Sequence, residues 1–205
     1  MVTTNAVRRV ALTGGIATGK TYAREAFQKL GVPTSDADVR AREAVAPGTS
    51  GLREVVTRFG SGVLDSSGSI DRARLAAIVF ADPAARRDLE AIVHPYVRTA
   101  TDAWFQSLDP AHHAFGMADI PLLFEAGRER DFYKVIVVAA KPETQLRRLM
   151  ERDGLTEADA RQRIAAQLPI QSKVERADYV IYTDGTFEET DRQVRDVFER
   201  LRAAV

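Results

Sequence analysis

The chain has 205 residues, no cysteine and a formal net charge of zero, because 29 basic residues balance 29 acidic ones. With 45% hydrophobic and 28% charged residues, the composition is typical of a water-soluble globular protein. These values exclude disulfides, thiolate metal sites and a cysteine nucleophile, and they argue against bulk electrostatic capture of nucleic acid or membrane.

The length fits one large domain or one domain with an insertion. No apolar run approaches the roughly 20 residues that cross a bilayer, and residues 1–7 lack the apolar centre of a signal peptide. We therefore expect a cytoplasmic protein without nucleic-acid or membrane partners. The oligomeric state is open, and a monomer is compatible with the sequence.

The first motif is a phosphate-binding loop. An apolar run at residues 10–12 leads into residues 14–21, GGIATGKT, which fit G-x-x-x-x-G-K-[ST]. Gly14 and Gly19 let the backbone turn in conformations barred to other residues and approach an anion closely. The N–H groups of the loop then form a nest for phosphates at the positive end of the following helix.

The last two residues of the loop carry its side-chain chemistry. Lys20 would reach the β- and γ-phosphates of a nucleotide, and the Thr21 hydroxyl would ligate Mg²⁺. Apolar residues follow at helical spacing, which places the loop between a strand and a helix. The loop thus predicts binding of a nucleoside triphosphate.

An acidic pair follows the second predicted strand, residues 32–35. Asp36 and Asp38 stand at its carboxyl end, where open α/β sheets bind ligands. One of them can cap the helix that runs to Val45, which leaves the other for chemistry. We take Asp36 as the candidate general base for an attacking hydroxyl.

Residues 51–108 show helical patterns and no convincing strand. Asp71 and Asp82 are predicted to cap two helices, and Pro95 is expected to end the second of these helices and begin a third. A helical stretch of this size within an α/β chain indicates an inserted subdomain. His94, beside Pro95, has either a structural or a catalytic role.

One GTPase-like pattern is explained by turn composition. Residues 65–68, DSSG, fit D-x-x-G, but their composition favours a turn. The guanine-reading N-K-x-D element is excluded, because Asn5 is the only asparagine in the chain. The chain is therefore not expected to be a GTPase.

Three further strands are predicted at residues 115–118, 134–140 and 177–182. The first of these strands ends in Asp119, which either holds Mg²⁺ or caps its own turn. Alternating strands and helices predict an α/β fold with a five-stranded parallel sheet flanked by helices.

The helix beginning at Pro142 carries Arg148 and Arg152 four residues apart on one face. The next stretch, residues 153–171, is polar and has a possible helix cap at Thr156. It is either a solvated helix face or a lid over the phosphates, where arginines would neutralise a transferring phosphoryl group.

Taken together, the motifs resemble the dephospho-CoA kinase family over residues 8–200. They are the loop LTGGIATGKT, the acidic element DAD at 36–38, GSIDR at 68–72, His94-Pro95, DIPLLFE at 119–125, QLRRLMERDGLTE at 145–157 and Ala177-Asp178. The resemblance implies ATP-dependent phosphorylation of the ribose 3′-hydroxyl of dephospho-CoA, the last step of coenzyme A synthesis.

The resemblance also implies the layout of the site and of the P-loop kinase fold. The core would span about 8–46 and 110–205, with a helical CoA-binding region at about 50–109 and a lid at about 150–172. Asp36 would act as the base, and Lys20, Arg148 and Arg152 would stabilise the phosphoryl group. Mg²⁺ would lie between Thr21 and Asp119. The ATP phosphates would bind residues Gly14, Gly15, Ile16, Ala17, Thr18, Gly19, Lys20, Thr21 and Tyr22.

The chain departs from the family pattern in two places. The loop usually reads G-S-G-K-S, whereas here Ala17 and Thr18 precede Gly19. The family usually has Asn before the glycine that follows the fifth strand, where this chain has Asp184. Two other interpretations stay open: a different P-loop kinase for small molecules or nucleotides, and a nucleotide-binding switch without transfer activity.

Overall fold

The computed structural model describes residues 6–203. The chain divides into two compact units: Asp36–Trp104 forms one, and the residues before and after this segment form the other. Each unit is described separately below, beginning with the one that carries the phosphate loop.

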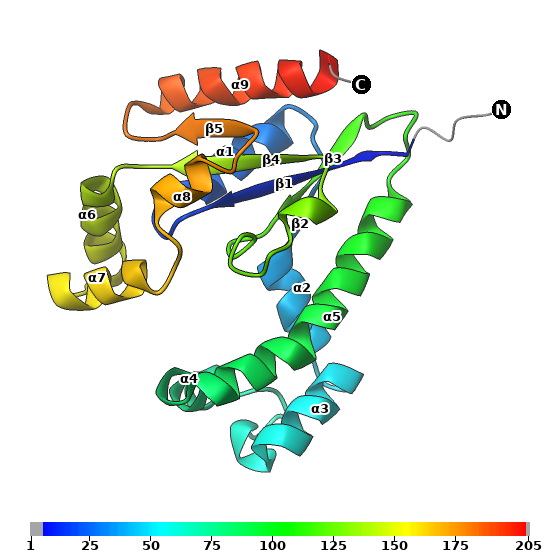
Figure 1. Ribbon diagram of the computed structural model, residues 1–205. Coiled ribbons are helices and arrows are strands. Elements are labelled where there is room, and N and C mark those ends of the chain that lie inside the picture. The colour runs from blue at the N-terminus through cyan, green and yellow to red at the C-terminus, as the bar shows by residue number, and fades with distance from the viewer. Residues whose placement is uncertain (1–5, 204–205) are drawn as a thin grey trace. The chain divides into compact units, whose positions relative to one another are not determined.

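The first unit is built on a five-stranded parallel sheet, as the sequence predicts (Figure 1). Its strand order is β2-β3-β1-β4-β5. The strands are β1 (Arg8–Gly14), β2 (Thr34–Asp36), β3 (Phe115–Asp119), β4 (Lys134–Ala139) and β5 (Tyr179–Tyr182). In the register of β1 with β3, Leu12 pairs with Asp119. The end of β3 therefore lies at the same edge of the sheet as the loop that follows β1.

Helices on both sides of this sheet complete the unit. They are α1 (Lys20–Lys29), α6 (Pro142–Asp153), α7 (Glu157–Ala165), α8 (Ile170–Val174) and α9 (Phe187–Ala203), with a short η2 (Glu129–Asp131). Helices α1 and α9 pack against each other, whereas α8 packs against β4 and lies in front of the sheet in Figure 1.

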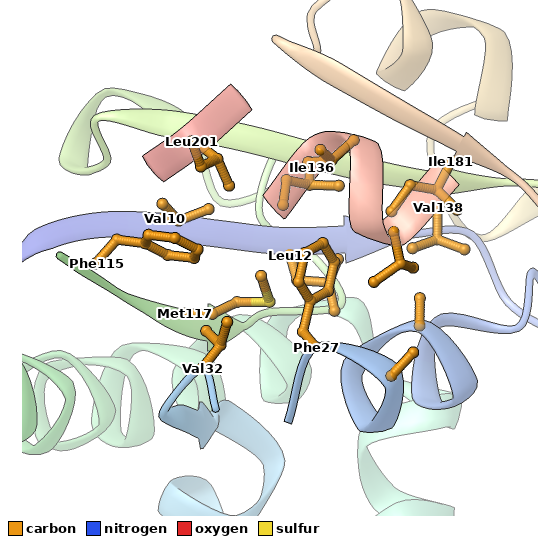
Figure 2. Close-up of a cluster of buried hydrophobic side chains, with 14 residues drawn as sticks. Val10, Leu12, Phe27, Val32, Phe115, Met117, Ile136, Val138, Ile181 and Leu201 are labelled. Atoms are coloured by element: carbon orange, nitrogen blue, oxygen red, sulfur yellow. The ribbon is translucent and has the colours of Figure 1, made fainter. Parts of the chain in front are cut away.

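The main hydrophobic core joins one face of the sheet to α1 and α9 (Figure 2). Leu12, Phe27, Ile136 and Ile181 are completely buried in it. Burial of such side chains stabilises the fold by about 1.5–3 kcal/mol each. This core fixes β1 and α1 relative to each other, and hence the two ends of the loop between them.

The second unit is helical. It contains α2 (Ala37–Ala44), α3 (Ser50–Phe59), η1 (Ser61–Val63), α4 (Arg72–Ala81) and most of α5 (Pro83–Ser107). Val55, Val63 and Leu75 form a small core of their own. Asp71 caps α4, as predicted, by accepting hydrogen bonds from the N–H groups of Ala73 and Arg74. The turn predicted at residues 65–68 is also confirmed.

The predicted helix break at Pro95 is wrong. Helix α5 runs without interruption from Pro83 to Ser107 and contains Pro95 in its interior. Proline removes one N–H and leaves the carbonyl of residue 91 without its helical partner. Ala91, His94 and Pro95 are all exposed, so water can satisfy that carbonyl. The cost of the proline is therefore limited at this position.

Between residues 6 and 203 there is no helix that combines the length and apolar character needed to cross a membrane.

Candidate active site

The phosphate loop runs into the first turn of α1, which begins at Lys20. Gly19 is the N-cap of this helix, has a φ of 81° and provides no side-chain cap. The first N–H groups of α1 are therefore not capped by that residue and form an anion-binding helix terminus. Ala17 also has a left-handed backbone, with a φ of 58°, which is unfavourable for a residue with a Cβ.

The two motif glycines act differently. Gly19 needs its conformational freedom, as predicted, but that explanation is wrong for Gly14, whose φ is not positive. A Cβ on Gly14 would lie only 2.6 Å from the carbonyl oxygen of Val138. A Cβ on Gly15 would lie 2.8 Å from Oε1 of Gln145. Close packing against the backbone of β4 thus requires glycine at position 14, whereas at position 15 the flexible Gln145 side chain would have to move aside.

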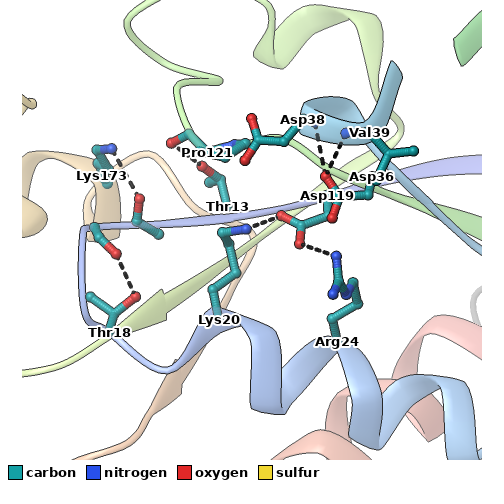
Figure 3. Close-up of polar contacts among 12 residues, drawn as sticks. Thr13, Thr18, Lys20, Arg24, Asp36, Asp38, Val39, Asp119, Pro121 and Lys173 are labelled. Atoms are coloured by element: carbon teal, nitrogen blue, oxygen red, sulfur yellow. Dashed lines mark hydrogen bonds and ion pairs between the residues drawn. The ribbon is translucent and has the colours of Figure 1, made fainter. Parts of the chain in front are cut away.

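Lys20 and Asp119 form an ion pair at the end of the sheet (Figure 3). Arg24, one turn further along α1, binds the other carboxylate oxygen of Asp119 at 3.2 Å. Asp119 is almost completely buried. The structure therefore brings together the predicted phosphate-binding lysine and a predicted Mg²⁺ ligand, and it adds Arg24, which the sequence did not single out.

Arg148 is tied to the phosphate loop through Thr183. Its guanidinium donates to the Thr183 hydroxyl at 3.0 Å and to the Thr183 carbonyl at 2.5 Å. The same hydroxyl donates to the carbonyl of Thr18 at 2.7 Å. Arg152 is largely exposed and pairs instead with Asp153. The two arginines thus differ in their surroundings, although they lie one helical turn apart.

Asp36 is the last residue of β2 and the N-cap of α2. Its Oδ1 accepts hydrogen bonds from the N–H groups of Asp38, at 2.8 Å, and Val39, at 3.4 Å (Figure 3). The capping role proposed for one of the two aspartates therefore belongs to Asp36, while Asp38 is exposed. The role of Asp36 as a general base stays a prediction.

Thr21 and Tyr22, which were also predicted to contact Mg²⁺ and the phosphates of ATP, lie on α1. Thr21 is exposed in the first turn of α1. The Tyr22 hydroxyl donates to Asp191, and the ring of Tyr22 lies 4.7 Å from that of Phe187 between centroids. Partial burial and the acceptor carboxylate of Asp191 raise the pKa of the Tyr22 hydroxyl above its ordinary value.

His94, for which the sequence left a structural or a catalytic role open, is exposed in α5 of the second unit.

Two functional candidates in the segment that follows α7 were not predicted from the sequence. Gln167 accepts a hydrogen bond from the backbone N–H of Ile16. Lys173 is completely buried and binds the carbonyl of Gly14. The sequence around these two residues contains no periodic signal for the contacts, because each contact joins residues more than 150 positions apart.

Within residues 6–203 no group of three or more His, Cys, Asp or Glu side chains could hold a metal ion. A magnesium ion that is bound mainly by nucleotide phosphates and water needs only one or two protein oxygens. The carboxylate of Asp119 and the hydroxyl of Thr21 are of the required type. The donor set therefore fits such an ion.

Comparison with known proteins agrees with this geometry. The family model described as "Dephospho-CoA kinase" matches residues 8–189. A protein named dephospho-CoA kinase from Geobacillus kaustophilus (strain HTA426) is 47% identical over 194 residues, which cover 95% of this chain and 96% of that protein.

Two solved structures are similar over nearly the whole chain. The structure of TT1252 from Thermus thermophilus has a TM-score of 0.82 and 32% identity, and covers 96% of this chain and 98% of its own. The structure of the dephospho-CoA kinase from Campylobacter jejuni has a TM-score of 0.71 and 30% identity. The match covers 94% of this chain and 96% of that structure's chain. On the combined evidence of sequence, fold and site, the chain belongs to the dephospho-CoA kinase family.

Proposed function

We propose that this protein transfers the γ-phosphoryl group of ATP to the ribose 3′-hydroxyl of dephospho-CoA, giving coenzyme A and ADP. The observation that carries the proposal is the strand–loop–helix at Gly14–Thr21, with Lys20 paired to Asp119, in a member of the dephospho-CoA kinase family. Membership makes the chain a phosphotransferase.

The donor half of the site follows from the loop. Residues Gly14–Tyr22 would surround the phosphates of ATP with their N–H groups, except that of Ile16, which is donated to Gln167, and the uncapped N-terminus of α1 adds its positive field. Lys20 would exchange its contact with Asp119 for the β- and γ-phosphates. Because the N–H donors of the loop are fixed by the backbone, they stabilise developing negative charge without costly reorganisation.

On the side of the site that binds dephospho-CoA, the proposed reaction depends on Asp36. In the proposed reaction Asp36 takes the proton of the 3′-hydroxyl, and the oxygen forms a bond to the γ-phosphorus. The bond from that phosphorus to the β–γ bridging oxygen breaks, and ADP leaves with the electron pair. Arg148 and Arg152 would neutralise the charge on the phosphoryl oxygens. Support for Asp36 comes from its place at the carboxyl end of a sheet strand.

Thr21 and Asp119 are the residues that would hold Mg²⁺, which neutralises phosphate charge when bound. In the same proposal, residues 50–109 bind dephospho-CoA and residues 150–172 form the lid. A cytoplasmic location stays a prediction, and the oligomeric state stays open.

A coupled assay for ADP, run with a panel of acceptors, tests the proposed function. We expect turnover with dephospho-CoA and far less with nucleoside monophosphates or shikimate. A preference for a nucleoside monophosphate would favour a different P-loop kinase, and ATP binding without any product would favour a switch protein. The Lys20→Ala variant, which we expect to lose both affinity and rate, controls for contaminating kinases.

A further inference from the structure

The phosphate loop contains a strained residue whose conformation needs external support. Ala17 has a φ of 58°. A left-handed backbone at a residue with a Cβ persists only where neighbouring contacts impose it. On the C-terminal side of Ala17, Thr18 binds the carbonyl of Gly15 through its hydroxyl at 2.9 Å and accepts a hydrogen bond from Thr183.

The N-terminal side of the loop is held by Gln167, between α7 and α8. Its Oε1 accepts a hydrogen bond of 2.9 Å from the N–H of Ile16, the residue before Ala17. Gln167 is half-buried, so this bond is partly protected from competition by water. The next residue, Leu168, donates its own N–H to Oε1 of Glu125 at 3.0 Å.

Lys173, on α8, holds the start of the loop. Its ammonium group donates to the carbonyl of Gly14 at 3.1 Å (Figure 3) and pairs with Oε1 of Glu125 at 2.8 Å. The side chain of Lys173 is 0% exposed. A buried ammonium ion is costly unless it is paired and hydrogen-bonded, and here both contacts are made.

We propose that Gln167 and Lys173 are positioning residues that hold the turn from Gly14 to Ile16 in the shape that binds the donor phosphates. The proposal deepens the proposed function and rests on it, because it concerns the ATP side of the same site. Neither residue needs to touch the nucleotide. Both act through the backbone groups that they fix.

The same contacts connect the loop to the segment predicted to be the lid. Gln167 lies within residues 150–172, and it is bonded directly to the phosphate loop. The C-terminal end of this segment is therefore anchored by Gln167 to the loop and by Leu168 to Glu125. A change in the position of residues 167–173 would alter the alignment of the loop N–H groups, and phosphate affinity depends on that alignment.

The first test compares Gln167→Leu with Gln171→Leu by calorimetric titration with ADP and with inorganic tripolyphosphate. Gln171 lies on α8, is exposed and donates a hydrogen bond from its side-chain amide to Glu175. Loss of one net hydrogen bond corresponds to about a 5–10-fold change in an equilibrium constant. We therefore expect Gln167→Leu to weaken both ligands about 5–10-fold, and Gln171→Leu to leave both unchanged.

Tripolyphosphate separates positioning of the loop from effects on the base of the nucleotide. Equal weakening of ADP and tripolyphosphate at an unchanged melting temperature supports the proposal. Affinities within twofold of the wild type would overturn it, and so would a loss confined to ADP. These titrations do not use dephospho-CoA. They can therefore contradict the positioning roles while the acceptor assay supports the proposed function, and they can support the positioning roles while the acceptor assay contradicts the function.

Lys173 is tested together with its partner, because removal of only one member leaves an unpaired buried charge. We expect the variant Lys173→Met/Glu125→Gln to bind tripolyphosphate about 5–10-fold more weakly, since the Gly14 carbonyl loses its donor. Circular dichroism verifies that the double variant is folded. Wild-type affinity in the folded double variant would overturn the role of Lys173, and a variant that does not fold leaves the proposal to be decided by Gln167→Leu.

Discussion

Asp36 combines a structural contact with a proposed catalytic one. Its Oδ1 caps α2 through the N–H of Asp38. Asparagine at this position keeps a side-chain oxygen for the cap but cannot accept the proton of a hydroxyl group. We expect Asp36→Asn to lower kcat by about 10²–10⁴-fold while the affinity for ADP stays nearly unchanged.

Steady-state kinetics with dephospho-CoA and titration with ADP measure the two effects of Asp36→Asn. The matched control is Asp38→Asn, because Asp38 is exposed and lies two residues further along the chain, in the first turn of α2. If Asp36→Asn retains the wild-type kcat, Asp36 is not the base and Asp119 becomes the candidate.

Ala17 stores strain in the phosphate loop, where the family usually has glycine. A left-handed backbone costs a residue with a Cβ about 1–2 kcal/mol, whereas glycine adopts it freely but loses about 0.5–1 kcal/mol in conformational entropy. We expect Ala17→Gly to raise the free energy of unfolding by about 0.5–1 kcal/mol, measured by urea denaturation.

An alanine in right-handed helical conformation gives the opposite result and serves as the control for Ala17→Gly. Ala158 is exposed in α7, and glycine there is expected to lower the free energy of unfolding. A decrease for Ala17→Gly as well would mean that the left-handed conformation carries no strain.

Helix α5 tolerates Pro95 at a measurable cost. The ring removes a helical hydrogen bond, and a proline in a helix interior costs roughly 3 kcal/mol relative to alanine. Because the position is exposed, we expect Pro95→Ala to recover only part of this cost and to raise the free energy of unfolding by about 1–2 kcal/mol.

Denaturation followed by circular dichroism at 222 nm checks the prediction for Pro95. Replacement of the preceding residue, His94→Ala, introduces no missing backbone bond and should change stability by less than about 0.5 kcal/mol. Lower stability of Pro95→Ala would show that the second unit depends on the proline ring.

The stability of the whole protein should fall in acid. Burial raises the pKa of Asp184, but hydrogen bonds from the Lys141 N–H and the Thr144 hydroxyl, with the charges of Lys141 and Arg148, outweigh it and leave the pKa below its ordinary value. Five other carboxyl groups also have lowered pKa values: Asp65, Asp109, Glu129, Asp153 and Glu188.

A carboxyl group with a lowered pKa in the folded state binds fewer protons there than in the unfolded chain. Its contribution is therefore present above the unfolded pKa, near 4, and is lost as the pH falls through the folded value. We expect the free energy of unfolding to decrease between about pH 5 and 3.

The variant Asp184→Asn isolates one of these contributions. Asp184 lies at the N-terminus of α6, where a negative charge is worth about 0.3–1 kcal/mol. We expect the variant to lose about this amount at pH 7 and progressively less as the pH falls below 4, measured by urea unfolding at several pH values. An equal loss at all of these pH values would exclude the charge as the cause.

Local sequence was sufficient to predict most of the fold. The buried strands β3 and β4 are continuous apolar runs, and the caps at Asp71 and Thr156 lie at the predicted residues. The phosphate loop is also recognisable from the sequence, because its N–H groups and its lysine are contiguous in the chain. Such features depend on contacts between residues only a few positions apart.

Tertiary structure decided the rest of the site. The ion pair of Lys20 with Asp119, the bonds of Arg148 to Thr183 and the support of the loop by Gln167 and Lys173 join distant residues. Such contacts depend on how the helices wrap around the sheet, and the local pattern of hydrophobic residues does not encode them. At Pro95 the local sequence predicted a helix break, but α5 continues through the proline. The missing hydrogen bond is tolerated there because the position is exposed to water.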